Sequence, residues 1–208
     1  MYRKYVKRLI DVILGAVLLI VTSPIVIVAA LFVKMDSRGP AFFTQMRIGK
    51  DCKVFKLYKL RTMQVETRGI DGRVLDDCER VTRVGRIIRR LSIDELPQLI
   101  NIVKGDMSFV GPRPLLVRYL PYYTDEELRR HEVRPGITGL AQINGRGFLQ
   151  WEERFRYDLQ YVDNLSFALD AKIVLGTIAQ VVKGSGSSTV RPSYLVDFDE
   201  HRRFVRLR

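Results

Sequence analysis

The sequence contains few of the residues that build disulfide frameworks and metal centres. Its 208 residues include two cysteines and two histidines. Cys52 and Cys78 form no CxxC pattern, so no disulfide framework is indicated and a reducing cytosolic setting is the default. His131 and His201 have no neighbour at metal-ligand spacing, and both are interpreted as surface residues. Histidine-based acid–base chemistry therefore has little support.

Acidic residues are scarce relative to basic ones. The chain has 23 Asp and Glu against 35 Lys and Arg, which gives a formal net charge of +12. This charge favours a partner with negative charge, and nucleic acid, anionic lipid and phosphorylated substrates all fit. The length corresponds to one domain with room for an anchor.

Charge is absent from one long segment near the N-terminus. Residues 12–33 form an apolar run of 22 residues, and about 20 residues suffice to cross a bilayer core. A cleaved signal peptide would need a shorter apolar core and a small-residue cleavage site, and neither is evident. Ser23 and Pro24 lie at the midpoint. Proline removes a backbone donor and kinks the helix there, and the Ser23 hydroxyl can satisfy a carbonyl that the kink frees.

Basic residues flank the apolar run on both sides; they are Arg3, Lys4, Lys7 and Arg8 before it, and Lys34, Arg38, Arg47 and Lys50 after it. Because positive flanks prefer the cytoplasm, the two ends compete for the same side of a membrane. A helix that enters, breaks at Ser23-Pro24 and returns resolves this conflict. A proline-kinked spanning helix is the alternative, and charge alone leaves both open.

The segment that follows alternates apolar and polar residues and predicts a β-hairpin over 40–63 with its turn at 49–51. One strand face carries Phe55 and Leu57, and the other carries Lys56 and Tyr58. Residues 64–80 are polar and predict a loop. In the next segment, apolar residues recur on one face of a predicted helix, and arginines occupy the other positions. The apolar face consists of Val84, Ile87, Ile88 and Leu91. Such a helix suits a membrane surface, or equally a solvated position on a core.

Two adjacent carboxylates, Asp94 and Glu95, follow this basic helix. The next helix is predicted to begin near Leu96-Pro97 and to end at Gly105. The acids would then lie in its cap or first turn, and the sequence from Ser92 to Glu95 resembles a capping box. The usual explanation is structural, since acids at a helix start complement free N–H groups and the helix dipole.

Two segments rich in glycine and proline, 105–114 and 134–147, predict loops. They contain Arg113, Arg134 and Arg146, whose guanidinium groups, with free backbone donors, suit phosphate oxygens. Two further helices follow around 151–162 and 169–182, and their apolar stripes are typical of core positions. Aromatic residues beside Arg154 and Arg156 could instead lie at a lipid interface. The tail from residue 185 is predicted to be loose and basic.

Taken together, these segments resemble the bacterial sugar transferase family, the monotopic phosphoglycosyl transferases that start membrane glycan assembly on a polyprenol phosphate. The resemblance covers nearly the whole chain, through KRLIDVILG, TSP, FTQMRIG, FKLYKLRTM, SIDELPQLINIVKGDMSFVGPRP, VRPGITGLAQINGR and LSFALDAKI. It implies an α+β fold that is mainly helical. It also implies a re-entrant membrane helix broken at Ser23-Pro24, a small hairpin and amphipathic interfacial helices. The expected divisions are an anchor at 1–36, a catalytic domain at 37–184 and a tail at 185–208.

The resemblance also implies an activity. The expected enzyme transfers a phosphosugar from a UDP-sugar to polyprenol (undecaprenyl) phosphate with Mg²⁺, on the cytoplasmic face of the bacterial inner membrane. The family's catalytic Asp-Glu pair matches Asp94 and Glu95, with Asp94 as the expected nucleophile and metal ligand. Glu95 would either help the acceptor oxygen to attack or hold the metal, and the sequence leaves both roles open. An aspartate is ionised at neutral pH and needs no general base to attack. The basic residues expected to bind phosphate are Lys59, Arg89, Arg113, Arg134 and Arg146.

Membrane lipids and downstream glycosyltransferases are the other expected partners, and nucleic acid is not expected. The sequence allows two alternatives to this proposed enzyme activity. The first is a membrane-tethered basic domain that binds nucleic acid or anionic lipid, but acids among the arginines would repel phosphate. The second is a lipid-phosphate hydrolase, which would release inorganic phosphate. The sequence does not identify the sugar.

Overall fold

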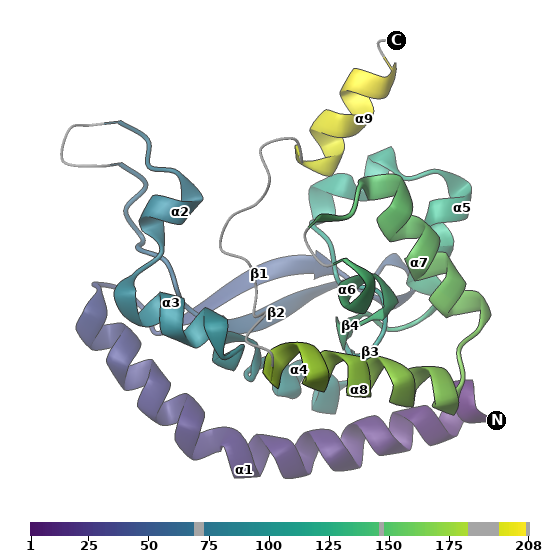
Figure 1. Cartoon of the computed structure of the whole chain (residues 1–208), viewed down its shortest axis with the longest axis horizontal. Helices are drawn as coiled ribbons and strands as arrows, with labels where there is room; N and C mark the ends of the chain where they lie inside the picture. The colour runs from purple at the N-terminus through teal and green to yellow at the C-terminus, as the bar shows by residue number, and fades with distance from the viewer. Residues whose placement is uncertain (69–72, 146–147, 183–195, 207–208) are drawn as a thin grey trace.

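The computed structural model describes residues 1–68, 73–145, 148–182 and 196–206. The fold is mainly helical, as predicted, and contains two small sheets (Figure 1). The α-helices are α1 (Lys7–Asp36), α2 (Asp77–Arg80), α3 (Arg83–Arg90), α4 (Gln98–Lys104), α5 (Asp125–Leu128), α6 (Leu140–Asn144), α7 (Trp151–Asp163), α8 (Phe167–Val182) and α9 (Phe198–Arg206). The strands are β1 (Phe42–Ile48), β2 (Val54–Leu60), β3 (Ser108–Val110) and β4 (Gly136–Thr138).

Helix α1 contains the apolar run and continues through Pro24 without interruption. It is bent in its middle part, and its concave side faces the rest of the molecule (Figure 1). Because Pro24 has no N–H, the carbonyl of Ile20 loses its helical partner, and the Ser23 hydroxyl donates to that carbonyl at 2.8 Å. The predicted bend and its compensation are therefore present, but the expected break is a bend within one helix.

Both ends of α1 are attached to the globular part. At its start, Asp170 of α8 accepts hydrogen bonds from the Tyr2 hydroxyl at 2.6 Å and the Lys7 ammonium at 2.7 Å. Arg8 donates to the carbonyls of Ile102 and Val103 at the end of α4. At the other end, the Asp36 carboxylate accepts from the backbone of α3, and Arg61 donates to three carbonyls between α1 and β1.

The stretch Tyr2–Asp36 is the one segment among the described residues that is long and apolar enough to cross a membrane. Only 11% of the most apolar 18-residue stretch of this segment is buried in the protein. Water is a poor solvent for so large an apolar surface, so this helix indicates membrane association.

The predicted hairpin is confirmed. Strands β1 and β2 pair antiparallel from Phe42 opposite Leu60 to Ile48 opposite Val54. The face with Phe55 and Leu57 is buried against α4, which positions the end of β2 beside the turn that precedes that helix.

The two glycine- and proline-rich segments differ from the prediction, because each contains a short strand. Strands β3 and β4 pair in parallel, with Ser108 opposite Gly136 and Val110 opposite Thr138. The backbones at Gly111 and Gly136 approach so closely that a Cβ on either would overlap backbone atoms of the other segment. The glycines that suggested loops therefore permit a close pairing.

Several predicted faces are divided in the structure. On α3, Ile88 packs against α1 and β2, whereas Ile87 is 61% and Leu91 56% exposed. The predicted stripe on α8 is core only in part, since Ile173 is fully buried while Ile178 is 54% exposed. These exposed apolar residues agree with interfacial helices rather than with a wholly buried core.

Trp151 and Phe155 lie in an aromatic core, as their apolar stripe predicted, and not at the alternative lipid interface.

Three other expectations are wrong in whole or in part. The predicted loop 64–80 ends in helix α2. His131 is buried, and burial followed by the charge of Arg130 lowers its pKa to about 3. The tail is not loose throughout either, because residues 198–206 form α9, which lies on the opposite side of the molecule from α1 (Figure 1). Residues 185–195 lie outside the described residues.

Candidate active site

Asp94 and Glu95 lie in a 3-10 turn, Ile93–Glu95, that precedes α4. Ser92 enters this turn in the left-handed conformation (φ 57°, ψ 21°), and its side chain forms no cap hydrogen bond. The predicted capping box is therefore not formed. Helix α4 begins later, after Pro97, and no backbone N–H among the described residues bonds to either carboxylate. Capping of α4 therefore does not explain the two acids.

Glu95 forms ion pairs with two cations. Its Oε1 accepts from Lys59 Nζ of β2 at 2.7 Å and from Arg113 Nη2 at 2.9 Å. Burial alone would favour the neutral carboxyl, but the positive charges of Lys59 and Arg113 and their hydrogen bonds outweigh it, so the pKa of Glu95 is well below its usual range. Glu95 is a charged residue that fixes two cations in place.

Asp94 has fewer polar contacts than Glu95. Its Oδ2 lies 3.7 Å from Lys59 Nζ, beyond hydrogen-bond distance, and no described group donates a hydrogen bond to it. The side chain is only 13% exposed, and burial raises its pKa against the opposing charge of Lys59. A carboxylate that is more basic than usual and accepts no hydrogen bond is a better nucleophile than one that is fully paired.

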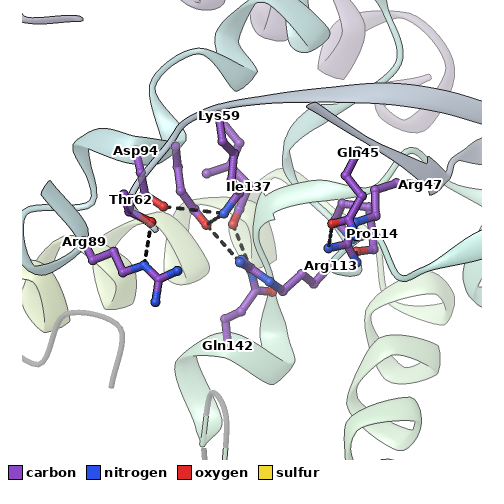
Figure 2. Close-up of polar contacts among 11 residues, drawn as sticks. Gln45, Arg47, Lys59, Thr62, Arg89, Asp94, Arg113, Pro114, Ile137 and Gln142 are labelled. Atoms are coloured by element: carbon purple, nitrogen blue, oxygen red, sulfur yellow. Dashed lines mark hydrogen bonds and ion pairs between the residues drawn. The ribbon is translucent and has the colours of Figure 1, made fainter. Parts of the chain in front are cut away.

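Arg89 joins Lys59 and Arg113 beside the two acids, as Figure 2 shows. Arg89 of α3 is held by a hydrogen bond from its Nε to Thr62 Oγ1 at 2.8 Å, and its charge acts on Asp94. Arg113 lies between two prolines after β3. The negative charge of Glu95 raises the pKa of its guanidinium, whose side chain remains 45% exposed. The predicted residues Lys59, Arg89 and Arg113 thus converge on the two acids.

The other predicted phosphate-binding arginines are not in this group. Arg134 donates from Nε to the carbonyl of Gly105 at 2.8 Å, next to Arg8 at the C-terminal end of α4. Asp94 and Glu95 lie before the opposite end of that helix. Arg134 therefore complements the helix end that carries negative partial charge. Arg146 lies outside the described residues.

Two residues near Arg113 were not selected from the sequence. Arg47 of β1 donates to Gln45 Oε1 and to the carbonyl of Pro114, and forms no ion pair with a described carboxylate (Figure 2). Burial, and then the charge of Arg113, lower its pKa to about 10. Gln142 of α6 donates to the carbonyl of Ile137, while its Oε1 is buried without a partner. Arg47 belongs to the FTQMRIG motif, the one signal that could have identified it.

Mg²⁺ is the metal that the family resemblance implies. Among the described residues, no three His, Cys, Asp or Glu side chains are grouped to hold a metal. Mg²⁺ is often bound through one or two carboxylates together with substrate phosphates, and this mode needs no protein cage. Asp94 fits it, because its oxygens accept no hydrogen bond from described residues, whereas Glu95 is already paired.

The chain is similar to known proteins over most of its length. The profile described as bacterial sugar transferase matches residues 2–184. The uncharacterized sugar transferase EpsL of Bacillus subtilis (strain 168) is 52% identical over 180 residues, which cover 86% of this chain and 89% of that protein.

Two relatives that are named for their activities are similar over comparable lengths. The UDP-glucose:undecaprenyl-phosphate glucose-1-phosphate transferase of Caulobacter vibrioides is 43% identical over 185 residues, covering 85% of this chain and 69% of that protein. The UDP-N-acetylgalactosamine-undecaprenyl-phosphate N-acetylgalactosaminephosphotransferase of Aeromonas hydrophila is 38% identical over 194 residues, covering 88% and 45%. The matched profile spans most of the chain, and the chain belongs to the bacterial sugar transferase family.

Proposed function

We propose that this protein transfers a phosphosugar from a UDP-sugar to undecaprenyl phosphate through a covalent intermediate on Asp94. The observation that carries the proposal is the contrast between the two acids. Glu95 is neutralised by Lys59 and Arg113, while Asp94 beside it accepts no hydrogen bond from described residues. The substrates are those named for relatives at 43% and 38% identity.

In the first half-reaction, a carboxylate oxygen of Asp94 attacks the sugar-bearing phosphorus. A bond forms between that oxygen and phosphorus, the bond from phosphorus to the bridging oxygen breaks, and UMP leaves with the bonding electron pair. Lys59, Arg89 and Arg113 bind the diphosphate oxygens and reduce the repulsion between the carboxylate and its anionic target. Mg²⁺ held by Asp94 and the diphosphate would supply further charge neutralisation.

In the second half-reaction, a phosphate oxygen of the lipid attacks the same phosphorus, and Asp94 leaves as a carboxylate. The products are UMP and undecaprenyl-diphosphate-sugar. Two separate displacements let one nucleophile serve a soluble donor and a lipid acceptor in turn, and they predict ping-pong kinetics. Glu95 keeps Lys59 and Arg113 in position through both steps.

The proposal includes a re-entrant α1 on the cytoplasmic face. Its support is that both ends of α1 bond to the same globular part, Lys7 to α8 and Asp36 to α3. A straight helix of 30 residues would be about 45 Å long and would leave its ends on opposite sides of a bilayer. A bent helix with both ends attached to one domain enters and leaves by the same face. The basic flanks favour the cytoplasmic face, because positive residues prefer the cytoplasm.

Intact-mass measurement with donor alone tests the proposal. Wild-type protein incubated with a panel of UDP-sugars should gain the mass of one phosphosugar, mapped to Asp94 and removed by undecaprenyl phosphate. Asp94→Asn should form no adduct and lose turnover by about 1,000-fold or more, while its unfolding transition stays close to wild type. Asp77→Asn, on an 85% exposed side chain, is the matched control and should behave as wild type.

Full-rate transfer without any adduct would show direct transfer and refute the role of Asp94. Release of inorganic phosphate in place of UMP would indicate a hydrolase.

A further inference from the structure

We infer that the C-terminal segment 196–206, which includes α9, is a positioning element of the active site: it fixes Arg113 through a buried path of aromatic rings and the Arg130–Asp158 ion pair. This segment lies beyond residues 2–184, the part matched by the family profile. The part of this inference that concerns turnover rests on the proposed function.

The path begins at Phe198, the first residue of α9, which is fully buried. Its ring lies 5.2 Å from that of Tyr123, 5.0 Å from Phe155 and 5.2 Å from Trp151, between ring centroids. The Trp151 indole donates to the carbonyl of Val196 at 3.0 Å. Such a cluster is tightly packed, so a change in the ring at position 198 is transmitted to its neighbours.

Ion pairs fix the segment in register over this cluster. Arg118 pairs with Asp197 and, at 3.6 Å, with Asp199. Arg202 pairs with Glu127 of α5, and both side chains are largely buried. The segment is therefore docked by apolar and by charged contacts, and the charged contacts give the docking one orientation.

The next step joins the rings to Arg130. The guanidinium carbon of Arg130 lies 5.9 Å from the Tyr123 ring centroid and 5.6 Å from that of Phe155. Its Nε and Nη2 donate to Asp158 Oδ2 at 3.0 and 2.8 Å. The two side chains of this pair are 1% and 3% exposed. A buried ion pair is stable only where its geometry is well fixed, and Tyr123 and Phe155 form two of the walls that fix it.

The last step reaches the active site. Arg130 Nη2 also donates to the backbone carbonyl of Arg113 at 2.8 Å. Pro112 and Pro114 restrict the backbone on either side of Arg113. Because its backbone is held in this way, the half-exposed side chain of Arg113 loses less conformational entropy when it pairs with Glu95. The path thus runs from Phe198 through two rings and one ion pair to a phosphate-binding arginine.

Hydrogen exchange followed by mass spectrometry tests this path without any substrate. In full-length Phe198→Ala, amides in peptides covering 109–120 should exchange faster than in wild type, while peptides from β2, which lies away from this segment, should not change. Phe204→Ala is the matched control, because that ring lies on the same helix and is 64% exposed, and it should change neither. If Phe198→Ala does not fold, Phe198→Leu, which keeps most of the volume, should show the same change to a smaller extent.

Turnover provides the second test. Phe198→Ala should reduce kcat by about 10- to 100-fold, the effect expected from a displaced catalytic arginine. In an Arg113→Lys background, the same substitution should reduce kcat much less, because the group that it displaces is already changed. A segment that only stabilises the fold would give the same fold-loss in both backgrounds.

Unchanged exchange at 109–120, or equal losses of kcat in both backgrounds, would overturn the inference. If wild type transfers no phosphosugar, the proposed function fails, and the exchange measurement still decides whether α9 fixes the segment that carries Arg113.

Discussion

Replacing Glu95 with glutamine removes one negative charge between Lys59 and Arg113 and keeps an oxygen that accepts hydrogen bonds. Both cations contact Oε1, at 2.7 and 2.9 Å, and the Glu95 side chain is 19% exposed. Hydrogen bonds to charged groups contribute about 1.5–3 kcal/mol each, and the amide retains part of this. We therefore expect Glu95→Gln to lower the free energy of unfolding by about 1–3 kcal/mol at neutral pH.

The pH dependence of this difference follows from the depressed pKa of Glu95. A group whose pKa is lower in the folded protein stabilises folding above its unfolded pKa, about 4.3 for glutamate. Below that pH the contribution falls by about 1.4 kcal/mol per pH unit until the folded pKa is reached. Glutamine does not titrate. The difference between wild type and variant should be constant from about pH 7 to pH 5.5 and should shrink as the pH falls further.

Urea unfolding in detergent micelles measures this difference. The fluorescence of Trp151, the single tryptophan of the chain and 4% exposed, reports the transition. Glu153→Gln is the control, because Glu153 forms an exposed pair with Arg156 on α7 and should show little change at any pH. A difference between wild type and Glu95→Gln that stays the same at about pH 7 and pH 3.3 would refute the assignment of Glu95 as a charge held by two cations.

Two further predictions concern single positions. A cysteine in place of Lys4 should resist a membrane-impermeant thiol reagent added from the periplasm. Adding Pro24→Ala to this variant should straighten α1 and increase labelling. Strong labelling with Pro24 intact would contradict re-entry. Gly85→Ala should destabilise the protein by about 1–3 kcal/mol, because its Cβ would overlap the backbone of Thr62 and displace α3 with Arg89. In a thermal-unfolding comparison Gly176→Ala is the control, since its Cβ would meet only side-chain atoms at 3.5 Å or more; equal stability of the two variants would count against this packing.

Local features were predictable from the sequence because they depend on neighbouring residues. The hairpin follows from strict alternation around a glycine turn, and α3 and α4 follow from apolar periodicity and from Pro97 and Gly105. The bond from Ser23 to Ile20 follows from the missing N–H of Pro24. In each case the physical cause lies within a few residues of its effect.

Features that depend on distant partners were not predictable. The pairing of β3 with β4 joins two glycine-rich segments that have no periodicity of their own. Arg134 has the right chemistry for phosphate, but the fold places it at the far end of α4. Phe198 stands in a basic tail, and only an aromatic cluster assembled from other segments gives it a buried site.

The candidate site shows the same division. The resemblance identified Asp94 and Glu95 as a pair, and residue types identified the arginines. The separate states of the two acids depend on Lys59, which lies on β2 and approaches Glu95 more closely than Asp94. Adjacent acids in a sequence have no distinguishing mark, and their environments differ only once a strand and a loop surround them.

The attachments of α1 also imply an order of events during synthesis. Asp36 binds α3, 48 residues further along the chain, whereas Lys7 binds Asp170, 163 residues further along. At about 5–20 residues per second, a ribosome needs about 8–30 s to pass from Lys7 to Asp170. The end of α1 is therefore secured first. Its start gains its first contacts when Arg8 meets the end of α4, and its last ones when Tyr2 and Lys7 meet α8. The attachment of α1 at both ends is complete only after α8 has emerged.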